Sequence, residues 1–478
     1  MKEIVMRAGK SPFDVVTHEE FIHQDLMGTN SGNLLFSDAV HKQLTVPGTE
    51  VVAAGLRTDS SKENAARINE RFDLYAVPLA NAFRPSFGKS LDKLSTLIEQ
   101  LKIPVVVVGV GAQASTEYDT GRLDDISVSV RRFMKAVLNR SASVGVRGEL
   151  TADYLKKLGF KDVEVIGCPS MFWHGDTFPE LEAKPLDAGS RVAVNVSSQA
   201  EKEGGIAELT AHALSLHPEL TYYAQNLTDA ELLFWGDTSV AGNRRKPLPG
   251  LRSHPLVRGG HTRVPVDPAT WMAELAEHDF SFGTRIHGNM AALLAGTPSV
   301  VLAHDSRTLE LCRYFEIPHR LLREVEAGTA PADLLAEADY TALRKNHAER
   351  FRRYTDFLDR NGVQNTFSHG DGGKAWQKAL DALELPPSVT SWDGSDDGAL
   401  GYRMAWLREQ AVTARRGREK TAAQLREVEA ENKELRKLTA SLEKRTASLE
   451  ARLDQSGGGV RRVGRGVKRR AKGMLGKD

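Results

Sequence analysis

The chain has 478 residues, of which 41% are hydrophobic and 27% are charged. This composition excludes an intrinsically disordered protein, a collagen and a small disulfide-rich scaffold, and the length suits roughly three domains at about 150 residues each. The formal net charge is +1, but residues 456–478 contain eight Lys or Arg and one Asp, so this tail carries +7 and the remainder −6. Only the C-terminal tail is therefore basic.

The cysteine content and the N-terminus indicate the compartment. Cys168 and Cys312 are too few for a disulfide framework or a zinc site, which favours a reducing environment, and no metal is expected. The first residues contain no apolar signal core, and the longest mostly apolar stretch, residues 290–303, is shorter than the ~20 residues that span a bilayer. We expect a cytoplasmic protein whose only membrane contact is peripheral, at the inner face.

Short apolar runs alternate with amphipathic stretches between residues 50 and 170, which is typical of a parallel sheet covered by helices. The predicted strands are residues 74–79, Val105–Val108, Val144–Val146 and 163–166. The predicted helices are residues 86–101, 126–138 and a helix that follows Arg147 and stops at Gly159. These elements predict an N-terminal Rossmann-like domain over residues 1–187.

A Gly- and Pro-containing stretch at residues 175–190 separates this pattern from a second one. Further strands are predicted at residues 192–196, 220–224, 280–282 and 299–303. They indicate a C-terminal Rossmann-like domain with closing helices over residues 188–385. The predicted fold class is therefore α/β, with two domains facing a cleft at the carboxyl ends of both sheets, where α/β proteins usually bind ligands.

The C-terminal part has a different character. Residues 386–401, rich in Pro, Ser, Asp and Gly, predict a linker, and residues 402–455 contain heptads with Leu425 at position a. The d positions are Val428, Leu435, Leu442 and Leu449. This pattern predicts a coiled coil, and Asn432 at an a position favours a parallel homodimer, with a single solvated helix as the alternative.

The basic tail, residues 456–478, spaces its apolar residues near the helical period. This pattern suits peripheral contact with an anionic membrane, whereas the glycines at positions 464, 466, 473 and 476 suit a disordered solubilising tail. Nucleic-acid binding is disfavoured, because the tail has no aromatic residue for stacking on bases and the rest of the chain is acidic.

The most informative stretch is residues 280–307. A strand ends at Gly283, a tight turn presents Arg285 and His287, and a helix begins near Gly288. Because the free N–H groups and the dipole of a helix N-terminus attract anions, Arg285 and His287 lie where a phosphate or carboxylate would bind. The next strand delivers residues 304–307 to the same edge of the sheet.

Gly283-Thr-Arg-Ile-His-Gly followed by Ala291-Ala-Leu-Leu-Ala-Gly-Thr-Pro resembles the signature of the polysaccharide pyruvyl transferase family. Residues 143–170 and the glycine-rich loop at residues 28–35 are also similar to that family, and the similarity covers roughly residues 25–320. The resemblance implies a two-domain fold like that of GT-B glycosyltransferases. It also implies transfer of pyruvate from phosphoenolpyruvate onto two hydroxyls of a sugar, as a ketal, in a cell-surface polysaccharide or its precursor.

In this reaction phosphoenolpyruvate is the donor substrate and a sugar is the acceptor, and no further cofactor is implied. The donor's carboxylate and phosphate call for cations, and Arg147, Arg285 and Arg307 are the candidates. The catalytic residues are expected to be His287, as the acid/base group, and Arg285. The substrate-binding residues are expected to be Arg147, Arg307, Gly283, Gly288 and Asn33.

Three positions depart from the family pattern. Arg307 stands where many members have a lysine, and Cys168 and Asn33 stand where an aspartate is frequent. Cys168 is expected to be an inert, buried side chain. Two other functions stay open: a GT-B-type glycosyltransferase that uses a nucleotide sugar, and a non-catalytic protein whose coiled coil serves as an assembly scaffold.

Overall fold

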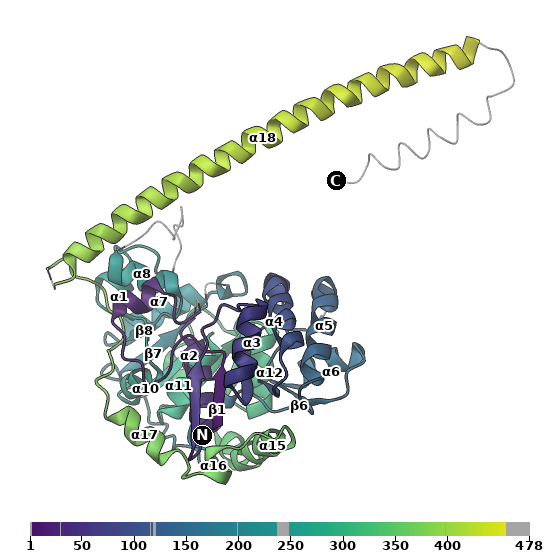
Figure 1. Ribbon diagram of the computed structural model, residues 1–478. Coiled ribbons are helices and arrows are strands. Elements are labelled where there is room, and N and C mark those ends of the chain that lie inside the picture. The colour runs from purple at the N-terminus through teal and green to yellow at the C-terminus, as the bar shows by residue number, and fades with distance from the viewer. Residues whose placement is uncertain are drawn as a thin grey trace. The chain divides into compact units, whose positions relative to one another are not determined.

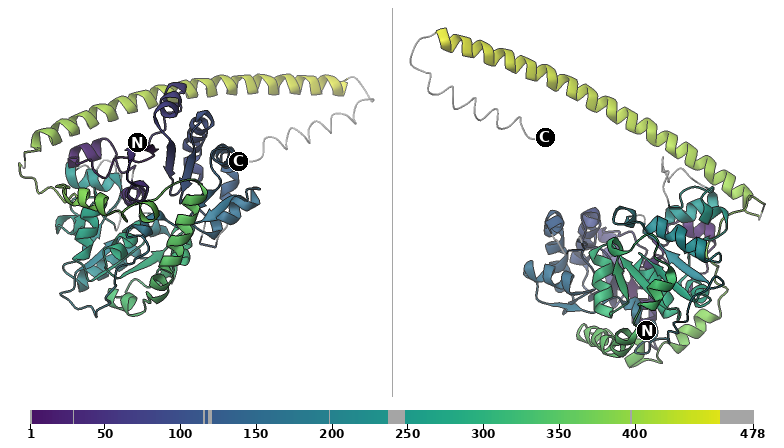
Figure 2. Two further views of the ribbon diagram at one scale, coloured as in Figure 1. Left: turned by 60° about the horizontal axis from the view of Figure 1, so that its bottom comes forward. Right: turned by 180° about the vertical axis from the view of Figure 1, so that it is seen from behind.

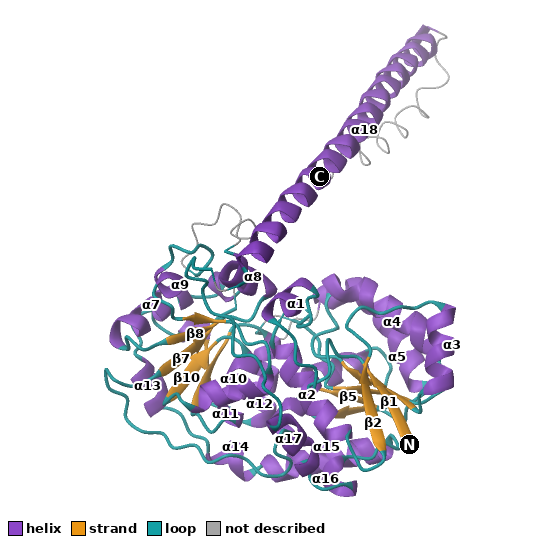
Figure 3. Cartoon of the chain, turned by 60° about the vertical axis from the view of Figure 1, so that its left-hand side comes forward, coloured by secondary structure: helices purple, strands orange, loops and turns teal. Residues whose placement is uncertain are grey.

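The computed structural model describes residues 2–28, 30–114, 116–117, 121–197, 199–236, 248–396 and 398–455 (Figure 1). It divides into two compact units, Met1–Gly394 and Ser395–Asp478. The first unit contains a four-stranded and a six-stranded parallel sheet and a parallel pair of strands, and the strands form two groups in Figure 3. The mixed α/β class with parallel sheets is therefore confirmed. The domain boundaries proposed from the sequence stay predictions.

The first sheet is parallel, in the order β2-β1-β3-β4. Its strands are β1 (Lys2–Met6), β2 (Thr49–Ala53), β3 (Leu74–Pro78) and β4 (Val105–Val108). A parallel pair, β5 (Val144–Val146) and β6 (Val163–Val165), continues beside β4 through a bridge between Val110 and Val146. β4 consists of four buried valines, as expected for a parallel strand covered on both faces.

Four helices complete the α/β alternation of this half. They are α3 (Lys62–Arg71), α4 (Gly88–Gln100), α5 (Ser127–Leu138) and α6 (Glu149–Lys157). The strands predicted at β4 and β5 and the helices predicted near α4, α5 and α6 are confirmed. The sequence does not predict β1, which is followed by α1 (His18–His23) and α2 (Gly32–Leu44).

The second sheet has six parallel strands in the order β12-β11-β10-β7-β8-β9. The strands are β7 (Val192–Asn195), β8 (Thr221–Tyr223), β9 (Thr262–Arg263), β10 (Phe280–Gly283), β11 (Ser299–Ala303) and β12 (His319–Leu321). The order reverses between β7 and β10, so the loops after these two strands diverge. Such a switch point is where open α/β sheets bind ligands.

Helices connect the strands of this half. They are α7 (Ile206–Leu216), α8 (Leu227–Trp235), α9 (Pro255–Arg258), α10 (Pro268–Ala276), α11 (Ile286–Leu294), α12 (Ser306–Phe315), α13 (Pro331–Ala336) and α14 (Thr341–Lys345). α11 and α12 follow β10 and β11 directly. Their first turns therefore lie at the carboxyl edge of the sheet.

The chain crosses between its halves more than once. Helix α1 contacts α8, while α15 (His347–Arg360), α16 (Thr366–His369) and α17 (Lys374–Asp381) return to the N-terminal half (Figures 1 and 2). Tyr354 donates to Gln43 at 2.7 Å, and Trp376 Nε1 donates to His41 Nδ1 at 3.0 Å. One apolar core consequently includes residues of both sheets, such as Met6 of β1 and Val301 of β11.

The second unit consists of the helix α18 (Leu400–Gln455) and its flanking residues. A long helix is thus present, beginning two residues before the predicted start of the coiled coil. A coiled-coil partner stays a prediction. Within the described ranges, no helix combines the length and the apolar character needed to cross a membrane. The predicted basic tail, residues 456–478, lies outside the described residues.

Candidate active site

The turn after β10 is shaped by two glycines. Gly283 has a φ of +149°, and a Cβ there would lie 1.9 Å from the carbonyl oxygen of Asn195 at the end of β7. A Cβ at Gly288 would lie 2.5 Å from Gln225 Nε2. The turn therefore packs directly against the neighbouring strand ends. Both predicted glycines are required by this packing, which brings the backbone of Arg285 to the switch point.

Arg285 is the N-cap residue of α11 and is held at its backbone and its side chain. Its N–H donates to Asn195 Oδ1 at 2.9 Å, and its Nε donates to the carbonyl of Val196 at 3.2 Å. Its Nη2 donates to Asn226 Oδ1 at 2.6 Å. Burial lowers the pKa of Arg285, whereas the carboxyl of Asp229 counteracts that effect. The guanidinium is therefore fixed in one orientation before any ligand arrives.

His287 lies in the first turn of α11 and faces the N-terminal half. A Cβ on Gly32, at the start of α2, would lie 2.8 Å from its Nδ1. Its Nε2 lies 3.5 Å from Cys168 Sγ. Burial, followed by the charges of Arg147, Arg307 and Arg285, lowers the pKa of His287 to about 3. The imidazole is consequently neutral at pH 7 in the ligand-free protein.

Cys168 contacts the candidate site directly, which the sequence does not predict. The thiol is buried and lies 3.3 Å from Ser170 Oγ and 3.5 Å from His287 Nε2. Burial raises its pKa, so the group is a neutral thiol and not a nucleophilic thiolate. The only sequence signal for this contact is the turn Gly167-Cys-Pro in the resemblance.

Arg307 lies in the first turn of α12, where the helix dipole disfavours a cation. Asp305, the N-cap residue, resolves this conflict, because its carboxylate forms an ion pair with the guanidinium of Arg307. Asp305 also accepts from the N–H of Thr308 at 3.0 Å and from its hydroxyl at 2.9 Å. Burial opposes ionisation of Asp305, but Arg307 and the other donors lower its pKa to about 2.

Two further arginines come from the N-terminal half. Arg147, at the end of β5, is buried, and its Nη2 donates to the carbonyl of Ala80. Its Nε has no hydrogen-bond partner among the described residues. Arg84, in the loop after β3, is not predicted by the sequence. Burial and the charges of Arg307 and Arg147 lower the pKa of Arg84 to about 10.

Asn81 links the two halves of this cluster. In the amide orientation that satisfies its neighbours, its oxygen accepts from Arg307 Nη1 at 3.1 Å and from Arg84 Nη1 at 2.9 Å. We call Arg84, Arg147, Arg285 and Arg307 the arginine cluster. Besides burial, the charges of Arg147, Arg307 and Arg285 lower the pKa of His287, and those of Arg307 and Arg147 lower the pKa of Arg84, so each member interacts electrostatically with at least one other.

The predicted substrate-binding residue Asn33 has a different environment. Its Nδ2 donates to the carbonyls of Met27 at 3.0 Å and Gly28 at 3.1 Å. The side chain therefore stabilises the loop before α2. The structure brings Arg147, Arg285, Arg307 and His287 together, whereas Asn33, in the first turn of α2, contacts the loop before this helix.

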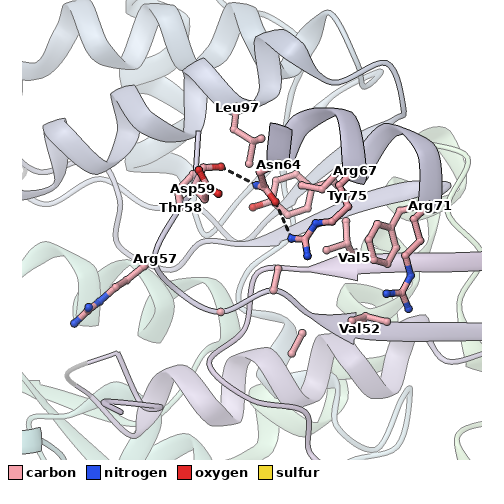
Figure 4. Close-up of a pocket in the computed structure, with 15 residues that line it drawn as sticks. Val5, Val52, Arg57, Thr58, Asp59, Asn64, Arg67, Arg71, Tyr75 and Leu97 are labelled. Atoms are coloured by element: carbon pink, nitrogen blue, oxygen red, sulfur yellow. Dashed lines mark hydrogen bonds between the residues drawn. The ribbon is translucent and has the colours of Figure 1, made fainter. Parts of the chain in front are cut away.

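A cavity of about 190 Å³ lies apart from the arginine cluster, beside α3 and the first sheet (Figure 4). Val52 and Tyr75 contribute to its wall, together with Arg67 and Arg71. Arg67 donates to Asn64 Oδ1 at 2.7 Å, and Arg71 forms an ion pair with Glu3 at 2.6 Å. No residue lining this cavity belongs to the arginine cluster.

The part of the chain that the structure describes contains no group of three or more His, Cys, Asp or Glu side chains able to hold a metal ion. The charges at the candidate site are instead provided by four guanidinium groups, with the carboxyl groups of Asp305, Asp229 and Glu310 near Arg307, Arg285 and Arg147, respectively. Such a site suits a ligand with several negative charges.

Comparison with curated proteins finds no significant match. Among solved structures, a UDP-GlcNAc 2-epimerase from Methanocaldococcus jannaschii is 10% identical, with 75% of this chain and 99% of that chain covered and a TM-score of 0.39. A glycosyltransferase from Streptomyces nogalater is 13% identical, with 80% and 100% covered and a TM-score of 0.29. These scores are too low to carry an argument about fold or chemistry.

A family model described as polysaccharide pyruvyl transferase matches residues 30–306. This range is more than half of the chain. It includes the start of α2, the loop with Arg84, the end of β5 with Arg147, and the turn with Arg285 and His287. The chain therefore belongs to the polysaccharide pyruvyl transferase family.

Proposed function

We propose that the chain transfers a pyruvyl group from phosphoenolpyruvate onto two hydroxyls of a sugar in a cell-surface polysaccharide or its precursor, forming a ketal and releasing phosphate. The observation that carries this proposal is the arginine cluster around His287. Phosphoenolpyruvate bears about 2.5 to 3 negative charges near pH 7, since a phosphate monoester contributes about 1.5 to 2 of them. Four arginines match these charges, and the unpartnered Nε of buried Arg147 offers a further donor.

The cluster also links donor binding to the protonation of His287. In the ligand-free protein the arginines disfavour the imidazolium. A bound polyanion offsets their charges and raises the pKa of His287, so this side chain takes up a proton when the donor is present. The proton is then available for the methylene carbon of phosphoenolpyruvate.

The reaction balances with the donor and two acceptor hydroxyls. The electron pair of the carbon–carbon double bond takes a proton at the methylene carbon, which becomes a methyl group. One hydroxyl oxygen then bonds to the central carbon and loses its proton, and the carbon–oxygen bond to phosphate breaks as the second hydroxyl attacks and loses its own proton. One of these two protons replaces the proton given to the methylene carbon, and the other leaves with the phosphate or passes to water. The arginine cluster stabilises the negative charge of the departing phosphate.

Release of phosphate from phosphoenolpyruvate, measured with a panel of amino and neutral sugars and lipid-linked glycans, tests the proposal. His287→Ala and Arg285→Ala serve as variants, and binding of phosphoenolpyruvate is measured by calorimetry. We expect acceptor-dependent release that both variants lose, and weaker donor binding in Arg285→Ala. Stabilisation by a nucleoside diphosphate without binding of phosphoenolpyruvate would assign the nucleotide-sugar alternative instead.

A further inference from the structure

His304 is a buried side chain at the carboxyl edge of the second sheet. It follows β11 directly and has 8% of its surface exposed. Neither of its ring nitrogens has a hydrogen-bond partner among the described residues. By contrast, three other buried histidines that the structure describes, His217, His278 and His347, each lack a partner at one nitrogen only. Since a buried polar atom without a partner destabilises the folded protein, the two nitrogens point to a ligand.

Three charged groups face this imidazole. Nε2 lies 3.8 Å from Asp305 Oδ2, which is beyond hydrogen-bond distance. Burial lowers the pKa of His304, Arg307 and Arg285 lower it further, and Asp305 counteracts them. The ring is therefore neutral, with one N–H and one free lone pair. This pair of atoms matches a hydroxyl group, which both donates and accepts, better than an anion, which only accepts.

We propose that His304 accepts the proton of a sugar hydroxyl as that hydroxyl attacks the pyruvyl group. The inference rests on the proposed function and identifies a second proton-transfer group for it. The hydroxyl O–H bond breaks, its proton goes to the free ring nitrogen of His304, and the oxygen electron pair forms the bond to the central carbon of the donor. Asp305 stabilises the imidazolium that results, and water removes the proton after turnover.

The charged groups around His287 and His304 differ, and the difference suits one histidine to act as an acid and the other as a base. Three arginines lower the pKa of His287 and no carboxylate counteracts them, so protonation of His287 depends on a bound anion. His304 has Asp305 beside it, a carboxylate that is already fixed by Thr308 and Arg307. A carboxylate beside an imidazole favours the imidazolium, which is the product of base catalysis. His287 is thus the donor-side acid, and His304 is the acceptor-side base.

The test compares wild type with His304→Gln, whose amide keeps a donor and an acceptor but cannot take a proton. The matched control is His347→Gln, a buried histidine whose Nε2 contacts the carbonyl of Gly175 in another part of the fold. We expect His304→Gln to bind phosphoenolpyruvate within threefold of wild type, which also shows that it is folded. Its acceptor-dependent turnover falls about 10²- to 10⁴-fold.

The pH profile separates base catalysis from a structural role. In wild type, turnover falls at acidic pH as His304 becomes protonated, and burial, the largest cause of its shift, holds the pKa of His304 below the ordinary histidine value. His304→Gln lacks this acidic limb, whereas His347→Gln keeps it. Turnover of His304→Gln within threefold of wild type, or an unchanged acidic limb, would overturn the inference and leave the proposed function intact.

The protonation state of His304, measured without an acceptor, provides a second test of the inference. The ¹⁵N shifts of histidine side chains, with His304 assigned through His304→Gln, are recorded in the complex with phosphoenolpyruvate. We expect a neutral His304 with one unprotonated nitrogen. A protonated His304 in this complex would overturn the inference. Absence of phosphoenolpyruvate binding by wild type would instead overturn the proposed function, and the inference with it.

Discussion

Arg307 carries a positive charge at a position where its helix disfavours one, and the neighbouring Asp305 offsets this unfavourable interaction. The helix dipole disfavours a cation in the first turn of α12, but the N-cap carboxylate of Asp305 pairs with it. The same carboxylate lies 3.8 Å from His304. Asp305 therefore both places Arg307 in the cluster and sets the charge beside the imidazole.

At this scale we predict that Arg84→Met weakens phosphoenolpyruvate binding. Arg84 shares the Asn81 oxygen with Arg307, and charge-assisted contacts to an anion contribute about 1.5–3 kcal/mol, so calorimetry should show a dissociation constant raised at least about tenfold. The matched control is Arg67→Met, an arginine beside α3 that belongs to the separate cavity. Equal affinity in both variants would exclude Arg84 from the donor site.

The site residues that the sequence predicts are those that belong to contiguous motifs. Arg285 and His287 follow a strand and open a helix, and Arg147 ends a strand, so their placement follows from local pattern alone. Arg84 and Cys168 reach the site only through tertiary packing, between segments far apart in the chain. Nothing in one sequence reports that a loop after β3 meets the start of α12.

Helix α2 shows the limit of pattern reasoning for a whole element. Every residue of α2 except Asn33 is buried, so the helix has no polar face that would reveal its period. Its polar side chains are paired with distant segments: Lys42 donates to Gln377 at 3.1 Å, and Gln43 donates to the carbonyl of Pro169 at 2.9 Å. These partners are invisible in the local sequence.

The contact between α12 and the start of α6 has a pH dependence that can be measured. Glu310 is buried and accepts from the N–H of Thr151 at 2.9 Å, and burial raises its pKa to about 7 against the charge of Arg147. A carboxyl whose pKa is raised by folding stabilises the fold below its unfolded value of 4.5, and this contribution is lost as pH rises through 7.

Glu310→Gln is neutral at every pH, so we predict that its free energy of unfolding relative to wild type increases from pH 5 to pH 8, by about 1–3 kcal/mol. Denaturant titrations at several pH values measure this difference. Glu219→Gln, at an exposed carboxyl, controls for the change in net charge. A difference that stays constant over this range would show that Glu310 is ionised throughout.

The d positions of the predicted coiled coil, which would form its apolar seam, are exposed on helix α18. Val428, Leu435, Leu442 and Leu449 are each at least half exposed. If a second copy covers them, Leu435→Ser with Leu442→Ser should convert a dimer to a monomer in sedimentation equilibrium, because serine removes the apolar area that drives the pairing. Lys437→Ser with Lys444→Ser, outside the seam, should leave the dimer intact. A wild-type monomer at all concentrations would contradict the predicted coiled coil.

For the whole molecule, the sequence predicts the alternation of strands and helices better than their assembly. The buried runs at β4, β5 and β11 have the predicted bounds, because apolar β-branched residues between helix signals have few alternative structures. The return of α15 to α17 across the N-terminal half does not follow from the pattern, since it depends on pairs such as Tyr354 with Gln43.

The return of α15–α17 has a consequence for how the protein is made. Helix α2 emerges from the ribosome early, but Trp376, the partner of its His41, follows more than 300 residues later. At about 5–20 residues per second, this interval lasts on the order of 20 to 70 seconds. During synthesis α2 therefore remains without its final cover, and its apolar surface is exposed to other molecules until α17 has been translated.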